Sequence, residues 1–266
     1  MAAIGVFDSG VGGISVLREI RALLPHEDLY YLADSRHAPY GPKPESYIVE
    51  RSVACCEFLL AHEVKAIVVA CNTATAAAVK TLRARCTLPI IAMEPGIKPA
   101  VAASRNGIIG VLATSGTLSS ARFSALLQQY SGAAHIITQP CPGLVEQIEQ
   151  GELHSPRLQS LLQRYLAPLL EAGVDTIILG CTHYPLVRAQ IQALAGPAVQ
   201  LIDTGPAVAR QVQRVLREHH LLAPGEANGV ERFWTSGEPA QAHEVLRQLW
   251  GEVEVAPMVA SPGNAG

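Results

Sequence analysis

Internal repetition is the feature that most constrains the fold of this chain. Residues 64–73 (VKAIVVACNT) resemble residues 174–183 (VDTIILGCTH), and residues 4–9 (IGVFDS) resemble residues 109–114 (IGVLAT). The two matches are separated by nearly equal lengths of sequence, and each is an apolar run followed by small polar residues. We therefore expect two duplicated halves.

Short apolar runs alternate with helical stretches along the whole chain. Residues 14–24 and 155–170 repeat apolar side chains at helical spacing. The runs that read as strands are IGVF, DLYYLA, KAIVVA, LPIIAM, GIIGVLA, AHIIT, DTIILG, VQLID and ERFWTS. Strands that alternate with helices form βαβ units with parallel strands. The sequence predicts an α/β protein of two pseudo-symmetric α/β domains with mainly parallel sheets.

The repeat also indicates where the domains divide. Residues 1–95 together with 204–266 are expected to form the first α/β domain, and residues 96–203 the second. The helix, strand and helix expected after residue 204 have no counterpart in the second half, so this segment is expected to return to the first domain. The tail at 256–266, rich in Ala, Pro and Gly, is expected to be frayed.

Cys71 and Cys181 occupy equivalent positions in the repeat, each at the end of a predicted strand. Ligands of open parallel sheets bind beyond the carboxyl ends of the strands. The active site is therefore expected in the cleft between the two domains, with one thiol on each side.

Composition and charge exclude several classes of partner. The formal net charge is −3 and no cluster of Lys or Arg is present, whereas nucleic-acid surfaces concentrate positive charge. No signal peptide is expected at residues 1–7, which run straight into a predicted strand, and no apolar run reaches bilayer length. We expect a cytoplasmic protein that binds a small-molecule substrate, with no nucleic-acid or membrane partner; a homodimer is among the assemblies that the sequence allows.

The six cysteines show neither the spacing of a zinc site nor the context of a disulfide framework. They are expected to be thiols, and no metal is expected. Most buried cytosolic cysteines are inert small hydrophobes, so reactivity must be argued from their neighbours. No lysine stands out as a pyridoxal phosphate ligand, and no cofactor is expected.

Two opposed thiols could form a disulfide or transfer protons. Removing an α-proton from one face of a substrate and supplying one to the other face inverts a stereocentre, and this needs a base and an acid on opposite sides. Asp8, Glu149 and His183 are the candidates to exchange protons with the thiols. Taken alone, Asp8 is equally well a helix N-cap or turn residue, whereas an isolated His183 is more often a core or helix-capping imidazole and an isolated Glu149 more often a solvated helix residue.

Small polar side chains gather at the same strand ends. Each alone is typical of a helix cap, but together with helix N-termini they form neutral donors suited to carboxylates. These residues are Ser9, Asn72, Thr73, Thr114, Thr117 and Thr182. The turn Pro39-Tyr40-Gly41 is an ordinary turn signature or a loop edge that adds backbone donors and a wall.

Five motifs resemble those of the cofactor-independent glutamate racemases, part of the aspartate/glutamate racemase superfamily. They are GVFDSGVGG (5–13), APYG (38–41), ACNTA (70–74), ATSGT (113–117) and GCTHYPL (180–186). They stand in the family's order, cover most of the chain and include both thiols. The resemblance implies an amino-acid racemase that interconverts L- and D-glutamate without a cofactor and supplies D-glutamate for peptidoglycan.

The resemblance also implies roles for individual residues. Cys71 would face the α-proton of the D-enantiomer with help from Asp8, and Cys181 that of the L-enantiomer with help from His183. Glu149 would be the carboxylate near the second thiol, with Glu146 the alternative because the preceding Gly-Leu pair departs from the family's bulkier one. Residues implied to hold the substrate are Ser9, Pro39, Tyr40, Gly41, Asn72, Thr73, Thr114, Thr117 and Thr182.

Three alternatives remain open at this point. A related racemase could act on aspartate or another amino acid. A nucleotide-dependent dehydrogenase is suggested by Gly10, Gly12 and Gly13 after the first strand, with Asp34 as the ribose-binding acid, although Ser15 occupies the sixth position of the fingerprint and Asp8 would repel a pyrophosphate. A non-catalytic amino-acid-binding module would also have a cleft between two lobes.

Overall fold

The computed structural model describes residues 2–225 and 227–259, whose strands form two parallel sheets. The six-stranded sheet has the order β10-β9-β2-β1-β3-β4 and the four-stranded sheet the order β6-β5-β7-β8. The strands are β1 (Ile4–Asp8), β2 (Leu29–Ala33), β3 (Ala66–Val69), β4 (Ile90–Ala92), β5 (Ile108–Ala113), β6 (His135–Pro140), β7 (Thr176–Leu179), β8 (Gln200–Ile202), β9 (Glu231–Thr235) and β10 (Val255–Pro257).

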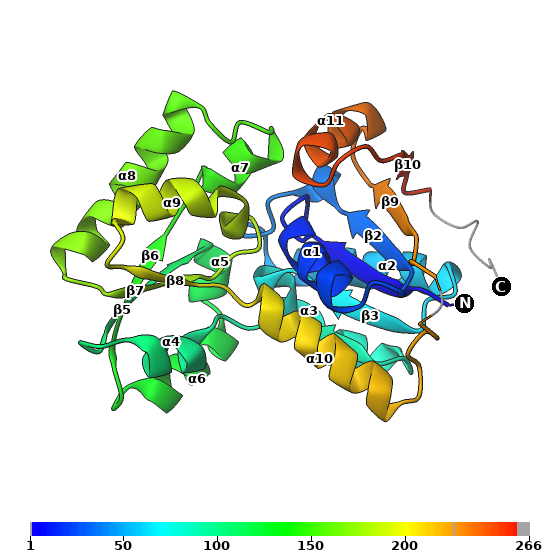
Figure 1. Ribbon diagram of the computed structural model, residues 1–266, viewed down its shortest axis with the longest axis horizontal. Helices are drawn as coiled ribbons and strands as arrows, with labels where there is room; N and C mark the ends of the chain where they lie inside the picture. Colours follow the sequence, from blue (N-terminus) through cyan, green and yellow to red (C-terminus); the bar gives the residue numbers. More distant parts are fainter. Residues whose placement is uncertain (1, 226, 260–266) are drawn as a thin grey trace.

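Helices cover both faces of each sheet. Each sheet with its helices forms one lobe, and the two lobes lie side by side (Figure 1). Two short 3-10 helices, η1 (Ser35–His37) and η2 (Tyr184–Val187), follow β2 and β7. The α-helices are α1 (Ile14–Leu23), α2 (Glu45–Ala61), α3 (Asn72–Arg85), α4 (Ile97–Ala103), α5 (Ser115–Leu118), α6 (Ala121–Tyr130), α7 (Leu144–Glu149), α8 (Pro156–Glu171), α9 (Arg188–Ala195), α10 (Gly205–Glu218) and α11 (Pro239–Leu249).

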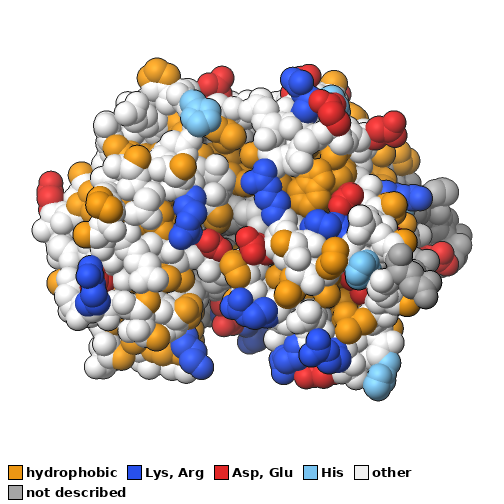
Figure 2. Space-filling model, in the orientation of Figure 1, with side chains coloured by type: hydrophobic (Ala, Val, Ile, Leu, Met, Phe, Trp, Pro, Cys, Tyr) orange, Lys and Arg blue, Asp and Glu red, His pale blue; other side chains and the backbone are white. Residues whose placement is uncertain are grey.

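The larger sheet is buried on both faces, which explains why its central strands are continuous apolar runs. Ile4 and Val6 of β1 pack in the cluster that includes α1, α10 and α11, whereas Phe7 points to the opposite face among α2 and α3. In the smaller sheet, β5 and β7 likewise divide their side chains between a cluster with α7 to α9 and one with α4 and α6. Figure 2 shows charged side chains of both signs along the furrow between the two lobes.

The two halves of the sequence repeat also have the same strand register. Ile4 of β1 lies opposite Ala66 of β3, and its counterpart Ile109 of β5 lies opposite Thr176 of β7. The orders β2-β1-β3-β4 and β6-β5-β7-β8 are therefore equivalent. The predicted fold class, two pseudo-symmetric α/β units with parallel sheets, is confirmed.

The segments after residue 204 return to the larger sheet. The strand β9 pairs with β2, and α10 packs against α1. The strands of the larger sheet therefore all lie within the predicted first domain, and those of the smaller sheet within the predicted second domain. The exact domain limits stay a prediction. Among the described residues, no helix has the length and apolar character needed to cross a membrane.

One expectation is wrong in part. Ala256 and Pro257, assigned to a frayed tail, belong to β10 and lie opposite Trp234 and Thr235 of β9. A three-residue strand that ends in proline gives no strand signal, and proline is tolerated here because β10 is at the edge of the sheet. Residues 260–266 lie outside the described residues.

Candidate active site

A small cavity lies where the carboxyl ends of β1 and β3 face those of β5 and β7. Its volume is about 10 Å³, which is room for about one water molecule. It is lined by Ser9, Pro39, Tyr40, Gly41, Cys71, Asn72, Thr73, Thr114, Val145, Cys181, Thr182 and His183. Of the site residues expected from the sequence, Asp8, Thr117 and Glu149 do not line it but contact residues that do.

Cys71 reaches the cavity from the first lobe as the N-cap residue of α3. Its thiol lies 3.7 Å from the hydroxyl of Ser9, to which it donates, and accepts from the backbone N–H of Ala74 at 3.4 Å. Burial raises the pKa of the Cys71 thiol well above its ordinary value, and the charge of Asp8 raises it further. The resting Cys71 therefore holds its proton.

Cys181 reaches the cavity from the second lobe and lies beside an imidazole. Its sulfur is 3.6 Å from Nδ1 of His183, and Nε2 of the same ring is 2.5 Å from Oε1 of Glu149. Burial lowers the pKa of His183, but the hydrogen bonds and charges of Cys181 and Glu149 outweigh it and raise the pKa well above its usual value. Both nitrogens of the His183 ring thus face possible hydrogen-bond acceptors, an arrangement that favours the protonated imidazolium.

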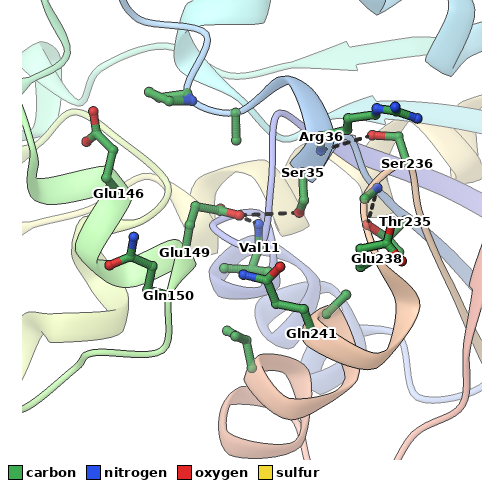
Figure 3. Close-up of a pocket in the computed structure, with 15 residues that line it drawn as sticks. Val11, Ser35, Arg36, Glu146, Glu149, Gln150, Thr235, Ser236, Glu238 and Gln241 are labelled. Carbon is green, nitrogen blue, oxygen red and sulfur yellow. Dashed lines mark hydrogen bonds between the residues drawn. The ribbon is translucent and has the colours of Figure 1, made fainter.

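Glu149 joins the two lobes beside the cavity. It lies at the end of α7 and accepts from the backbone N–H of Val11 at 2.7 Å and from the hydroxyl of Ser35 at 3.3 Å (Figure 3). Both of those residues belong to the other lobe. Glu146, the alternative left by the sequence, lines the neighbouring pocket, its carboxylate turned away from that of Glu149 (Figure 3), and the His183 ring contacts Glu149 instead.

Asp8 lies behind the first thiol and is fully buried. Its carboxylate accepts from the backbone N–H of Gly13 at 2.7 Å, from Ser9 at 3.3 Å and from the Thr182 hydroxyl of the other lobe at 3.3 Å. Burial raises the pKa of Asp8 above its ordinary value, although the charge of His183 opposes this. A carboxyl group with a raised pKa beside a thiol with a raised pKa can exchange a proton with it.

Three hydroxyl groups form a triangle across the interface. The hydroxyl of Thr73 lies 2.9 Å from that of Thr114 and 3.1 Å from that of Thr117, and the last two are 3.0 Å apart. Asn72, 4% exposed in the cavity wall, has no hydrogen-bond partner among the described residues for either its amide oxygen or its amide nitrogen. A buried amide with both atoms unsatisfied is costly, so this one is placed to bind a ligand that both donates and accepts.

The Tyr40 hydroxyl is not a substrate group in this geometry. It donates to Oδ2 of Asp34 at 2.6 Å, and the guanidinium of Arg51 binds both oxygens of that carboxylate at 2.9 and 3.0 Å. Pro39, Tyr40 and Gly41 therefore contribute a wall and backbone groups to the cavity. Asp34, fully buried and already paired, is not free to bind a ribose.

The glycine-rich loop after β1 makes room for the second lobe. A Cβ atom at Gly10 would lie 2.0 Å from Oε1 of Glu149, and one at Gly12 would lie 2.3 Å from Nδ1 of His183. These glycines are needed for close approach of the His183–Glu149 pair, and they do not form a pyrophosphate-binding turn. The dehydrogenase alternative loses its two supporting features.

Sequence reasoning missed one residue of the cavity wall, Val145. Val145 is an ordinary apolar helix residue beside Glu146, and nothing in its sequence context distinguishes it from a core residue. No group of three or more His, Cys, Asp or Glu side chains suited to a metal ion occurs in the described part of the chain.

Known proteins resemble this chain in sequence and in structure. The family described as Asp/Glu/Hydantoin racemase matches residues 4–212. A glutamate racemase of Pseudomonas aeruginosa is 57% identical over 254 residues, which are 95% of this chain and 96% of that protein.

Two crystal structures give the same result. A glutamate racemase isoform from Bacillus anthracis, 32% identical, matches with a TM-score of 0.86 over 96% of each chain. The Escherichia coli glutamate racemase in complex with L-glutamate and the activator UDP-MurNAc-Ala, 32% identical, matches with a TM-score of 0.85 over 97% of this chain and 98% of that one. The chain therefore belongs to the Asp/Glu/hydantoin racemase family and, within it, to the enzymes of the glutamate racemase group.

Proposed function

We propose that this enzyme interconverts L- and D-glutamate by a cofactor-independent mechanism in which Cys71 and Cys181 act on opposite faces of the α-carbon. The observation that carries the proposal is that both thiols line one cavity, each from a different lobe. Relatives named glutamate racemase, one of them with L-glutamate bound, support the choice of substrate.

The different surroundings of the two thiols indicate which one acts first as the base. Cys71 holds its proton, whereas Cys181 lies against the His183 imidazolium. In the L-to-D direction the Cys181 thiolate takes the α-proton and the Cys71 thiol gives its proton to the opposite face, so that the two sulfurs exchange protonation states. After the product leaves, Cys181 loses its proton to water and Cys71 regains one from water; His183 assists by stabilising the Cys181 thiolate, and the charge of Asp8 assists by favouring the protonated Cys71.

The neutral donors of the cavity stabilise the carbanion that forms between the two steps. Asn72 and Thr73 lie in the first turn of α3, where the helix N-terminus favours negative charge. Donors aimed at developing charge in a site with little water are the strongest electrostatic contribution available to an enzyme without a cofactor. The cavity is too small for an amino acid as it stands, so the lobes, which we assign to domains 1–95 plus 204–266 and 96–203, separate for binding and close for reaction.

We also assign the enzyme to the cytoplasm and its product, D-glutamate, to peptidoglycan synthesis. These assignments follow from resemblance to the family. A homodimer is compatible with the same proposal.

Polarimetry with purified protein tests the activity. The rotation of L-glutamate and of D-glutamate should each decay to zero, in the presence of EDTA and after treatment with hydroxylamine to remove aldehyde cofactors. L-Aspartate should react about 10-fold or more slowly, because one methylene changes transition-state binding by about 1–3 kcal/mol. Unchanged rotation of glutamate, or equal rates with aspartate, contradicts the proposal.

A further inference from the structure

The cavity that holds the two thiols is almost closed, so a substrate must pass through an adjoining hollow to reach it. Two larger hollows flank the cavity. One, which we call the vestibule, has a volume of about 850 Å³, and its wall includes Lys43, Thr73, Lys80, Glu94, Gly116 and Arg122. The other, which we call the acidic pocket, has a volume of about 410 Å³, and its wall includes Arg36, Glu146, Glu149 and Glu238.

Both hollows adjoin the thiol cavity through shared residues. Thr73 lines the vestibule and the cavity, and Pro39 lines the acidic pocket and the cavity. Geometry alone therefore leaves two routes for the substrate.

The charges of the two hollows distinguish them. Three carboxylates and one guanidinium line the acidic pocket, and Figure 3 shows Glu146, Glu149 and Glu238 around it. Glu149 is paired with His183, so the excess negative charge comes from Glu146 and Glu238. An amino acid with two carboxylates carries a net negative charge at neutral pH and is repelled there. The vestibule has the opposite balance, with three cationic side chains and two carboxylates in its wall.

The cationic side chains of the vestibule differ in whether they form a salt bridge. Arg122 pairs with Glu94 across the vestibule. Lys43 and Lys80 have no carboxylate within salt-bridge distance among the described residues. Two unpaired ammonium groups in a hollow produce a local field that attracts anions.

Among the described residues, no Lys or Arg lines the thiol cavity itself. The polar groups of its wall are hydroxyls, an amide, two thiols and the His183 ring, so the ammonium groups of the vestibule act on the approaching substrate and not on the bound one. The boundary is narrow, because a Cβ atom at Gly116 would lie 2.6 Å from the carbonyl oxygen of Gly41 in the other lobe. Separation of Gly41 from Gly116 opens the vestibule onto the thiol cavity beside Thr73.

We propose that Lys43 and Lys80 capture the anionic amino acid in the vestibule and that the substrate passes between Gly41 and Gly116 to the thiols. The proposal rests on the proposed function for the identity of the substrate. The route itself concerns any small anion that reaches the cavity.

Alkylation of the cavity thiols tests the route without relying on turnover. Anionic iodoacetate and neutral iodoacetamide are compared on the wild type, on Lys43→Gln/Lys80→Gln and on the control Lys98→Gln, an exposed lysine of α4 outside both hollows. Modification of Cys71 and Cys181 is followed by peptide mass spectrometry. The double variant should react with iodoacetate about 10-fold more slowly at low ionic strength, should react with iodoacetamide at the wild-type rate, and should lose the difference near 1 M salt.

Three results overturn the proposal. These are an unchanged iodoacetate rate, an equal slowing with both reagents, or a slowing of iodoacetate by Arg36→Gln in the acidic pocket in place of the double variant. Polarimetry on the same proteins should show a lower kcat/KM for both glutamate enantiomers at low salt with kcat unchanged. Because alkylation does not need racemisation, a failure of the glutamate assay with normal charge-dependent alkylation disproves the function but leaves the route standing.

Discussion

Cys71→Ala and Cys181→Ala are each expected to lower kcat/KM by about 10²–10⁴-fold or more, the contribution of a positioned general acid or base. Each variant removes one of the two groups that must act on opposite faces. Mirror-image substrates have equal free energies, so kcat/KM must fall by the same factor in both directions. Polarimetry from both enantiomers measures this directly.

A buried thiol elsewhere provides the matched control. Cys56 on α2 is 4% exposed and does not line the cavity, so Cys56→Ala should keep the wild-type kcat/KM. Circular dichroism and thermal unfolding of all three variants separate loss of chemistry from loss of fold. A well-folded Cys71→Ala or Cys181→Ala variant with wild-type activity would remove the two-thiol mechanism.

His183→Asn should lower kcat about 10²-fold, because it removes the only imidazole that contacts the Cys181 sulfur among the described residues. The pH profile gives the more specific readout. Hydrogen bonds and charges from Cys181 and Glu149 raise the pKa of His183, so the wild type should lose activity only as the pH rises through that raised value. The asparagine variant should lack this alkaline limb.

Glu149→Gln tests the same pair from the other side. Glutamine keeps a hydrogen-bond acceptor near Nε2 of His183, which Glu149 now contacts at 2.5 Å, but removes the negative charge. The pKa of His183 should therefore fall, and the alkaline limb should move to lower pH. An NMR titration of the imidazole measures the shift, and an unchanged pKa would mean that Glu149 does not set the charge of His183.

Much of the architecture could be predicted from the repeat. Ile4 of β1 and Ile109 of β5 are equivalent residues of the repeat. The register of β1 with β3 is accordingly the same as the register of β5 with β7. The nine apolar runs chosen from the sequence coincide with β1 to β9. The signal is plainest for β1, β3 and β7, which are buried along their whole length and are therefore nearly continuous apolar runs. The thiols that follow β3 and β7 lie at the carboxyl ends of two different sheets, where ligands of open parallel sheets bind, and these ends face each other across the cavity.

Features that depend on tertiary contact could not be predicted in the same way. The glutamate partner of His183 was open between Glu146 and Glu149, because the choice depends on how α7 faces Val11 and Ser35 in the other lobe. The hydrogen bond from the Tyr40 hydroxyl to the buried Asp34 carboxylate depends on tertiary packing, and no local sequence pattern predicts it.

The isotope content of the first product tests the central claim most directly. Racemisation of protonated L-glutamate is started in D₂O, and both enantiomers are separated and analysed by NMR before one-tenth of the substrate has reacted. A thiol carries a single proton, so Cys181 keeps the proton that it removes while Cys71 delivers a deuteron. The account predicts D-glutamate fully deuterated at the α-carbon and residual L-glutamate that is still protonated. Residual L-glutamate that gains deuterium as fast as D-glutamate forms, or D-glutamate that retains the original proton, would show that one group serves both faces and would contradict the account.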